Sequence, residues 1–143
     1  MRLVVDASVA VKWFIPEIYW QYAVRLQNYP ELCAPDFMLL ECGNILVKKV
    51  RRKELDRSDA DEIQQALLSA PIAFYPWQDL LQQAGVVAHE TYRSIYDCIY
   101  LVLAQQLNGR MVTADKKLYL ALENHPEWAE HLLWIEEVKN LEV

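Results

Sequence analysis

An apolar run at the start of the chain ends on an isolated carboxylate, and this feature most constrains the fold. Residues 3–5 are all apolar and predict a short buried strand, and Asp6 follows them directly. No other charged residue lies between Arg2 and Lys12. A carboxylate at the end of a buried strand costs several kcal/mol unless it is paired or binds a metal. The rest of the chain must therefore provide a partner for Asp6.

Short apolar segments alternate with helical patterns along the chain. We expect strands at residues 2–6, 72–75, 110–115 and 132–138, and helices at residues 17–28, 35–54, 59–69, 78–91, 94–109 and 116–124. This alternation predicts an α/β fold with a mainly parallel sheet. The length of 143 residues, without repeats or linkers, predicts one domain over residues 1–143. Ligands of such sheets gather at the carboxyl ends of strands, where Asp6 and Asp115 lie.

Composition excludes several classes of protein. No apolar run is long enough to span a bilayer, and the first residues lack the pattern of a signal peptide. Cys33, Cys42 and Cys98 are scattered and odd in number, so we expect reduced cysteines and a cytoplasmic location. The three glycines cannot form a dinucleotide-binding or Walker A loop. A net charge of −6 argues against coating nucleic acid by charge alone, but permits a nuclease with a local basic face.

Four acidic residues interrupt apolar surfaces at separate places in the chain. These four acids are Asp6, Glu41, Asp97 and Asp115. Two of them end predicted strands and two lie inside apolar helices, so we expect one shared site. Mg²⁺ favours a few carboxylates together with water and substrate phosphate, which makes a divalent cation the expected ligand. Ser8 and Thr113 lie two positions from an Asp, where an extended chain would turn their hydroxyls to the same side as the carboxylate.

Each acid also has a simpler explanation when taken alone. A carboxylate can cap a helix, and Asp97 lies four residues after Arg93, which is the spacing of a helical ion pair. These explanations account less well for all four acids together. Cys42 and Cys98 each follow one of the acids, but no histidine is placed to act as their base, so we expect them in the core.

The densest basic stretch lies at the end of the helix expected at residues 35–54. Its candidate RNA contacts are Lys48, Lys49, Arg51 and Arg52. Contact with RNA phosphates is one interpretation. A solvated helix end, where positive charge is favoured by the helix dipole, is the other.

Four segments of the chain carry a resemblance to a known family. They are VVDASVAVKWFIPE, APDFMLLECGNIL, YRSIYDCIYLVLAQ and MVTADKKL, in this order. Together they resemble the motifs of PIN-domain proteins, and most closely those of the VapC-type toxin ribonucleases of toxin–antitoxin pairs. The match runs from Leu3 to about Leu122. The resemblance implies a three-layer α/β/α domain, usually dimeric, that cuts RNA with Mg²⁺ or Mn²⁺.

By this resemblance the four acids are catalytic and metal-binding, and Asn44 is a supporting polar residue. We therefore expect a metal-dependent endoribonuclease, the toxin of a type II pair, with an antitoxin partner, a homodimeric state and no membrane association. The alternative is a non-catalytic PIN-like module that binds RNA or protein, against which the four intact acids count. Haloacid-dehalogenase-like phosphatases need a second Asp where Ser8 stands. Response-regulator receivers need an acidic pair and a late Lys that are not evident here.

Overall fold

A parallel five-stranded sheet forms the centre of the protein. A computed structural model describes residues 1–142. The strands are β1 (Leu3–Val5), β2 (Leu32–Pro35), β3 (Ala73–Tyr75), β4 (Arg110–Thr113) and β5 (Leu132–Trp134). They lie in the order β3-β2-β1-β4-β5, and all four strand pairs are parallel. The predicted α/β class with a mainly parallel sheet is confirmed.

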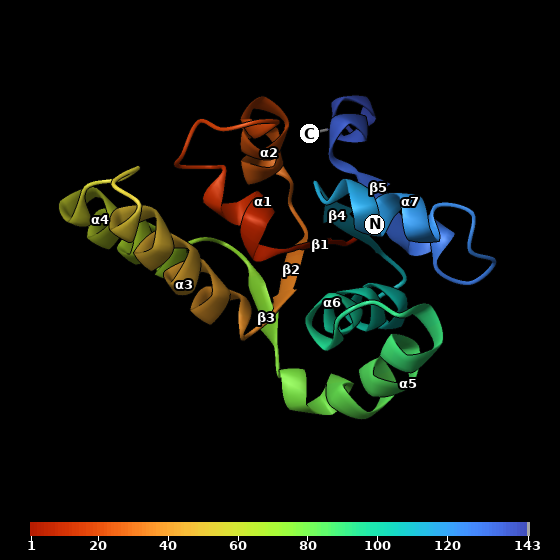
Figure 1. The fold of residues 1–143 in the computed structure, drawn as a ribbon. Helices are drawn as coiled ribbons and strands as arrows, with labels where there is room; N and C mark the ends of the chain where they lie inside the picture. Colours follow the sequence, from red (N-terminus) through yellow and green to blue (C-terminus); the bar gives the residue numbers. More distant parts are fainter. Residues whose placement is uncertain (143) are drawn as a thin grey trace.

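Helices cover both faces of this sheet and make the three layers. They are α1 (Ala7–Val11), α2 (Trp20–Arg25), α3 (Met38–Arg51), α4 (Arg57–Leu68), α5 (Leu81–Thr91), α6 (Ile95–Gln106) and α7 (Lys116–Leu122). Short 3₁₀ turns occupy Leu26–Asn28, Trp77–Leu80, Ala129–His131 and Ile135–Asn140. Helices α1 and α2 lie on one side of the sheet and α5 and α6 on the other, while α3 and α4 pair into a projecting arm (Figure 1).

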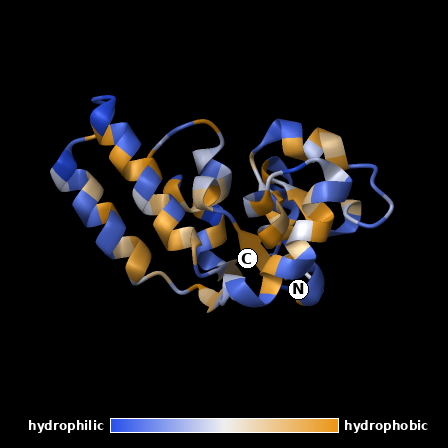
Figure 2. Cartoon of the chain, turned by 60° about the horizontal axis from the view of Figure 1, so that its bottom comes forward, coloured by the Kyte–Doolittle hydropathy of each residue, from blue (hydrophilic) through white to orange (hydrophobic). Residues whose placement is uncertain are grey.

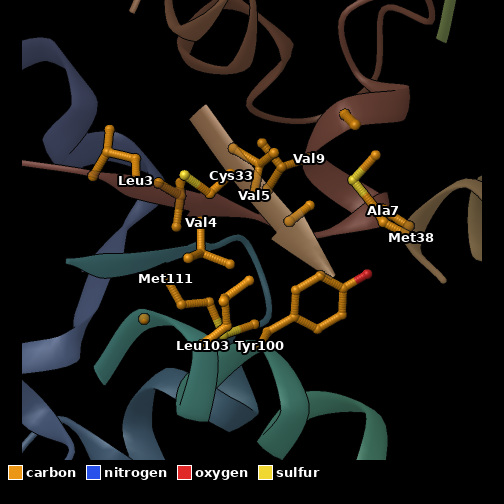
Figure 3. Close-up of a cluster of buried hydrophobic side chains, with 14 of the residues drawn as sticks. Leu3, Val4, Val5, Ala7, Val9, Cys33, Met38, Tyr100, Leu103 and Met111 are labelled. Atoms are coloured by element: carbon orange, nitrogen blue, oxygen red, sulfur yellow. The ribbon is translucent and has the colours of Figure 1, made fainter. Parts of the chain in front are cut away.

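The core is built around the central strand and helix α6. All three residues of β1 are fully buried, because β2 and β4 flank the strand and helices cover its faces. Seven consecutive residues of α6, Cys98–Ala104, are also buried. Their side chains meet those of β1 and β4, and the ring of Tyr100 lies in this cluster with its hydroxyl at the edge (Figure 3). Each buried Val or Leu contributes about 1.5–3 kcal/mol relative to exposure.

Polar residues are concentrated away from this core. The tip of the arm, where α3 and α4 join, is strongly hydrophilic, whereas the central strands are apolar (Figure 2). Over residues 1–142 no helix combines the length and the apolarity that crossing a bilayer requires.

The strand order places a crevice at the carboxyl ends of β1 and β4. The chain moves outward in one direction from β1 to β2 and β3, then returns past β1 to β4 and β5. The connections that follow β1 and β4 therefore leave toward opposite sides of the sheet. The place where the direction of the strand order changes is called the switch point, and ligands of α/β proteins bind there. Asp6 directly follows the last residue of β1, and Asp115 lies two residues after the end of β4.

Several expected elements differ from the observed ones. The sequence did not predict strand β2. The strand has only four residues, and its last one, Pro35, is typical of the first turn of a helix. The helix expected at residues 17–28 begins only at Trp20 and ends in a 3₁₀ turn. The last strand ends at Trp134, and the following residues form a 3₁₀ turn that buries Ile135 and Val138.

Asn108 and Gly109, which follow α6, have different structural roles. Asn108 adopts the left-handed backbone, with φ of 53°, and so terminates the helix. Gly109 has no positive φ; it is required because a Cβ there would collide with the backbone carbonyl of Arg2. That carbonyl accepts a hydrogen bond from the Arg110 N–H, so it is held at the amino end of the central strand β1.

We expect Gly109→Ala to lower the free energy of unfolding by about 2–3 kcal/mol, because backbone must move to admit the methyl group. Gly85→Ala is the matched control: it lies within α5 with open space around it, and should stabilise the protein by about 0.5–1 kcal/mol. Urea unfolding of both variants measures the difference. Equal stabilities would contradict the close approach to Arg2.

Candidate active site

Asp6 caps helix α1 and faces a pocket at the switch point. Its Oδ1 accepts hydrogen bonds from the Ser8 hydroxyl at 2.7 Å and from the Val9 N–H at 2.9 Å. Oδ2 accepts none from the described residues. Ser8 lies in α1 and not in extended chain, so it reaches the carboxylate by a helical turn and not by the strand spacing used to predict it.

Asp115 repeats this arrangement at helix α7. Its Oδ1 accepts a hydrogen bond from the Leu118 N–H at 3.1 Å, and the carboxylate is exposed. Thr113 is fully buried, and its hydroxyl accepts a hydrogen bond from the backbone N–H of Asp115 at 3.0 Å. Thr113 thus fixes the backbone that carries Asp115, and no hydrogen bond joins it to a carboxylate within residues 1–142.

Glu41 enters the same pocket from the first turn of α3. Its Oε1 accepts a hydrogen bond from the Tyr100 hydroxyl at 2.6 Å. Tyr100 lies on α6, one turn after Asp97, and is 2% exposed. This hydrogen bond connects the two helices that supply Glu41 and Asp97.

Asp97 lies in the first turn of α6, where its backbone N–H donates to the capping Ser94 hydroxyl at 3.1 Å. No ion pair joins Asp97 to Arg93 among the residues that the structure describes. The helical ion pair considered from the spacing is therefore not formed.

One pocket of about 210 Å³ brings the four acids together. It is lined by Asp6, Ala7, Ser8, Glu41, Ile45, Asp97, Tyr100 and Asp115. All four acids lie at helix N-termini, where the helix dipole favours negative charge. Asp6 and Asp115 therefore have two roles at once. Each caps a helix through Oδ1 and also lines the pocket.

The environment of the pocket disfavours negative charge on three of the acids. Burial raises the pKa of Asp6 to about 6, although the hydrogen bonds from Ser8 and Val9 lower it; the charges of Asp97 and Glu41 raise it further. Burial also raises the pKa of Glu41 and that of Asp97. A bound cation would relieve this penalty.

The donor set fits a hard divalent cation. Asp6, Glu41 and Asp115 each have one oxygen held by the protein, which leaves the other oxygen available as a ligand. Within residues 1–142 no three His, Cys, Asp or Glu side chains are already gathered closely enough to hold a metal ion. The acids line one pocket without forming a closed metal centre.

Other candidates from the sequence lie outside this pocket. Asn44 is exposed on α3 and lines a different groove, about 980 Å³ in volume, between α3 and α4. Lys49 is held by Glu17, with Nζ at 2.9 Å from Oε2, and Glu17 also pairs with buried Lys12 at 3.1 Å. Lys48, Arg51 and Arg52 remain exposed at the tip of the arm.

Cys42 and Cys98 are core residues, as predicted, and so is Cys33. Cys33, Cys42 and Cys98 are all buried and free of disulfides. Burial, reinforced by Asp6 and Glu41, raises the pKa of the Cys42 thiol to about 12, so this sulfur is not a nucleophile at neutral pH.

Among the residues that line the pocket, Tyr100 is the polar one that the sequence patterns did not indicate. Its spacing of three from Asp97 on a helix places both side chains on one face, and this signal could have identified it. The apolar character of α6 instead favoured a core position, which the ring does occupy.

A parallel α/β sheet with carboxylates at its switch point defines a class of proteins whose site suits a divalent cation. The chain belongs to the PIN-domain family: the PIN domain model matches residues 3–136. It is 29% identical over 121 residues to Ribonuclease VapC3 of Pyrobaculum aerophilum, covering 82% of this chain and 92% of that protein.

Solved structures share this fold. PAE2754 from Pyrobaculum aerophilum superposes with a TM-score of 0.71 at 20% identity, covering 99% of this chain and 91% of that one. Mycobacterium tuberculosis VapC20, described as a sarcin-ricin loop cleaving toxin, gives a TM-score of 0.62 at 19% identity, over 84% and 95% of the two chains. A toxin–antitoxin complex from Klebsiella pneumoniae also gives 0.62, at 15% identity over 92% and 95%.

Proposed function

We propose that this protein is a Mg²⁺- or Mn²⁺-dependent endoribonuclease that hydrolyses RNA phosphodiester bonds, and the toxin of a type II toxin–antitoxin pair. The observation that carries the proposal is the convergence of the four acids, from four separate helix starts, on one pocket. The similarity to a VapC ribonuclease supports RNA as the substrate. The similarity to a toxin–antitoxin complex supports an antitoxin partner.

The four acids would hold the metal and position the reacting groups. Asp6 and Asp97 would be direct ligands: both line the pocket and are partly buried, whereas Asp115 is exposed. Glu41 and Asp115 would ligate directly, through water, or orient the attacking water. Ser8 orients Asp6 by its hydrogen bond, and Thr113 fixes the backbone of Asp115. A bound divalent cation supplies Lewis acidity toward the scissile phosphate.

Cleavage of an end-labelled structured RNA tests the proposal. We expect discrete fragments with Mg²⁺ or Mn²⁺, none in EDTA, and recovery when metal is restored. Full activity in the chelator would contradict metal dependence. RNA binding without any cleavage in either metal would favour the alternative, a non-catalytic PIN-like module.

The basic tip of the arm is proposed as a secondary RNA contact. Lys48, Arg51 and Arg52 are exposed there, whereas Lys49 is engaged by Glu17 and Glu54. Ten residues of helix separate Glu41 from Arg51, which corresponds to about 15 Å. RNA bound in the pocket could therefore place neighbouring phosphates against this tip.

We expect the double variant Lys48→Gln/Arg51→Gln to weaken RNA binding and to reduce the slope of log K against log salt by about 1.4, or 0.7 for each lost contact to single-stranded RNA. Lys139→Gln, which removes an exposed charge elsewhere, is the control. Filter binding at four salt concentrations measures the slope. An unchanged slope would contradict RNA contact and would leave the interaction of these basic residues with the dipole of α3 as their role.

The assembly and setting of the protein are part of the same proposal. We propose that residues 1–143 form one nuclease domain, that it acts in the cytoplasm, and that it forms a homodimer. Leu40, Val47 and Leu68 are exposed along the groove between α3 and α4, and such apolar surfaces often lie in protein interfaces.

A further inference from the structure

Tyr100 is a buried side chain whose polar atom meets the acidic pocket. Its hydroxyl donates to Glu41 Oε1 at 2.6 Å, while the rest of the ring lies among the core residues of α6, β1 and β4 (Figure 3). A phenol buried in this way needs a hydrogen-bond partner, and Glu41 provides it. The contact is the only hydrogen bond to the Glu41 carboxylate within residues 1–142.

The ring of Tyr100 is held in place independently of this hydrogen bond. It packs edge-to-face against Phe37, with ring centroids 5.3 Å apart and planes at 70°. Phe37 lies one turn before Glu41, at the start of α3. The donor is therefore held at a packed contact between α3 and α6 that does not involve the Glu41 carboxylate.

The donor also stays protonated at neutral pH. The ordinary pKa of a phenol is about 10, so the hydroxyl carries its proton at pH 7. A protonated phenol can only donate to the carboxylate, so it selects the rotamers of Glu41 that bring Oε1 to it.

We propose that Tyr100 is a positioning residue: by holding Glu41 Oε1, it turns the other carboxylate oxygen of Glu41 toward the pocket as a metal ligand. The inference rests on the proposed metal-dependent function and adds a residue to its site. It also explains how a flexible glutamate can act beside the shorter, helix-capping aspartates. Asp6 and Asp115 each accept a hydrogen bond from a backbone N–H, and Asp6 accepts a second from Ser8, whereas the Glu41 carboxylate is oriented by a side chain alone.

The test is the affinity of metal-free protein for Mn²⁺, measured by calorimetry at pH 7.5. Tyr100→Phe keeps the ring and removes only the hydroxyl, and its fold is checked by melting without metal. We expect its dissociation constant for Mn²⁺ to rise by about 10-fold or more, as when other supports of metal ligands are removed. Tyr96→Phe is the control: Tyr96 lies one turn earlier on α6 and also packs against Phe37, at 5.9 Å. It should bind Mn²⁺ within about twofold of the wild type.

A double-variant comparison separates positioning from loosened packing. In the Glu41→Gln background, Tyr100→Phe should change the dissociation constant by less than about twofold, because Tyr100 acts through the Glu41 carboxylate. A 10-fold loss in that background as well would assign Tyr100 a merely structural role and overturn the inference. So would wild-type affinity in Tyr100→Phe. Absence of Mn²⁺ binding by the wild type would instead overturn the proposed function itself, and the role of Tyr100 with it.

Discussion

Replacing Asp6 with asparagine should slow RNA cleavage by at least about 100-fold while the protein stays folded. The variant keeps an Oδ1 that can accept the hydrogen bonds from Ser8 and Val9, so the start of α1 is preserved. It loses a negative charge that a divalent cation needs in the pocket. Cleavage of end-labelled RNA under single-turnover conditions, with far-ultraviolet circular dichroism as the test of folding, measures the effect.

Two further variants control this experiment. Asp79→Asn makes the same chemical change at an exposed acid outside the pocket, and should cleave at the wild-type rate. Ser8→Ala removes the hydroxyl that orients Asp6, and should lower the rate by about 10-fold. If Asp6→Asn cleaved RNA as fast as Asp79→Asn, Asp6 would have no part in catalysis.

The same substitution should make the metal-free protein more stable at neutral pH. Burial raises the pKa of Asp6 to about 6 in the folded protein, from an ordinary value of 3.8, so the folded state binds this proton more tightly than the unfolded state. Stability from this group is therefore present at low pH and is lost as pH rises from about 4 through 6. We expect Asp6→Asn to exceed the wild type by about 2 kcal/mol at pH 7, after allowance for solvent screening, and by less than about 1 kcal/mol at pH 4.

Urea unfolding in EDTA at pH 4, 5, 6 and 7 measures this difference. Glu17→Gln provides a control of opposite sign: burial raises the pKa of Glu17, but hydrogen bonds from Lys49 and Lys12 outweigh it and lower the pKa. Glu17→Gln should be destabilised most at pH 7 and less as the pH falls. A stability gap for Asp6→Asn that did not change with pH would show that Asp6 carries no penalty for its charge.

The placement of the acids was largely predictable from the sequence. An isolated charge in an apolar segment is visible without a structure, and parallel strands bring their carboxyl ends to one edge. Asp6 and Asp115 are positioned by this rule. Glu41 and Asp97 reach the site because α3 and α6 begin at that same edge of the sheet. The predicted helices at residues 35–54 and 94–109 start within three residues of the observed ones.

The remaining features depend on tertiary contacts that no local pattern encodes. Strand β2 is only four residues long, and its place beside β1 makes it a strand. Lys49 looked like a surface cation, but it is engaged by Glu17 from a distant loop. Gly109 is required by its close approach to the backbone of Arg2, which is distant in the sequence.

Thermal melting of wild type and Asp97→Asn, each with and without Mn²⁺, tests most directly whether the four acids form one metal site. Without metal, Asp97→Asn should melt at or above the wild type, because the substitution removes a partly buried charge whose pKa burial raises. With Mn²⁺ at a hundred times its dissociation constant, the wild type should gain about 2.7 kcal/mol, and Asp97→Asn should gain less. A wild type that Mn²⁺ does not stabilise, together with an Asp97→Asn variant that is simply destabilised, would contradict the shared metal site.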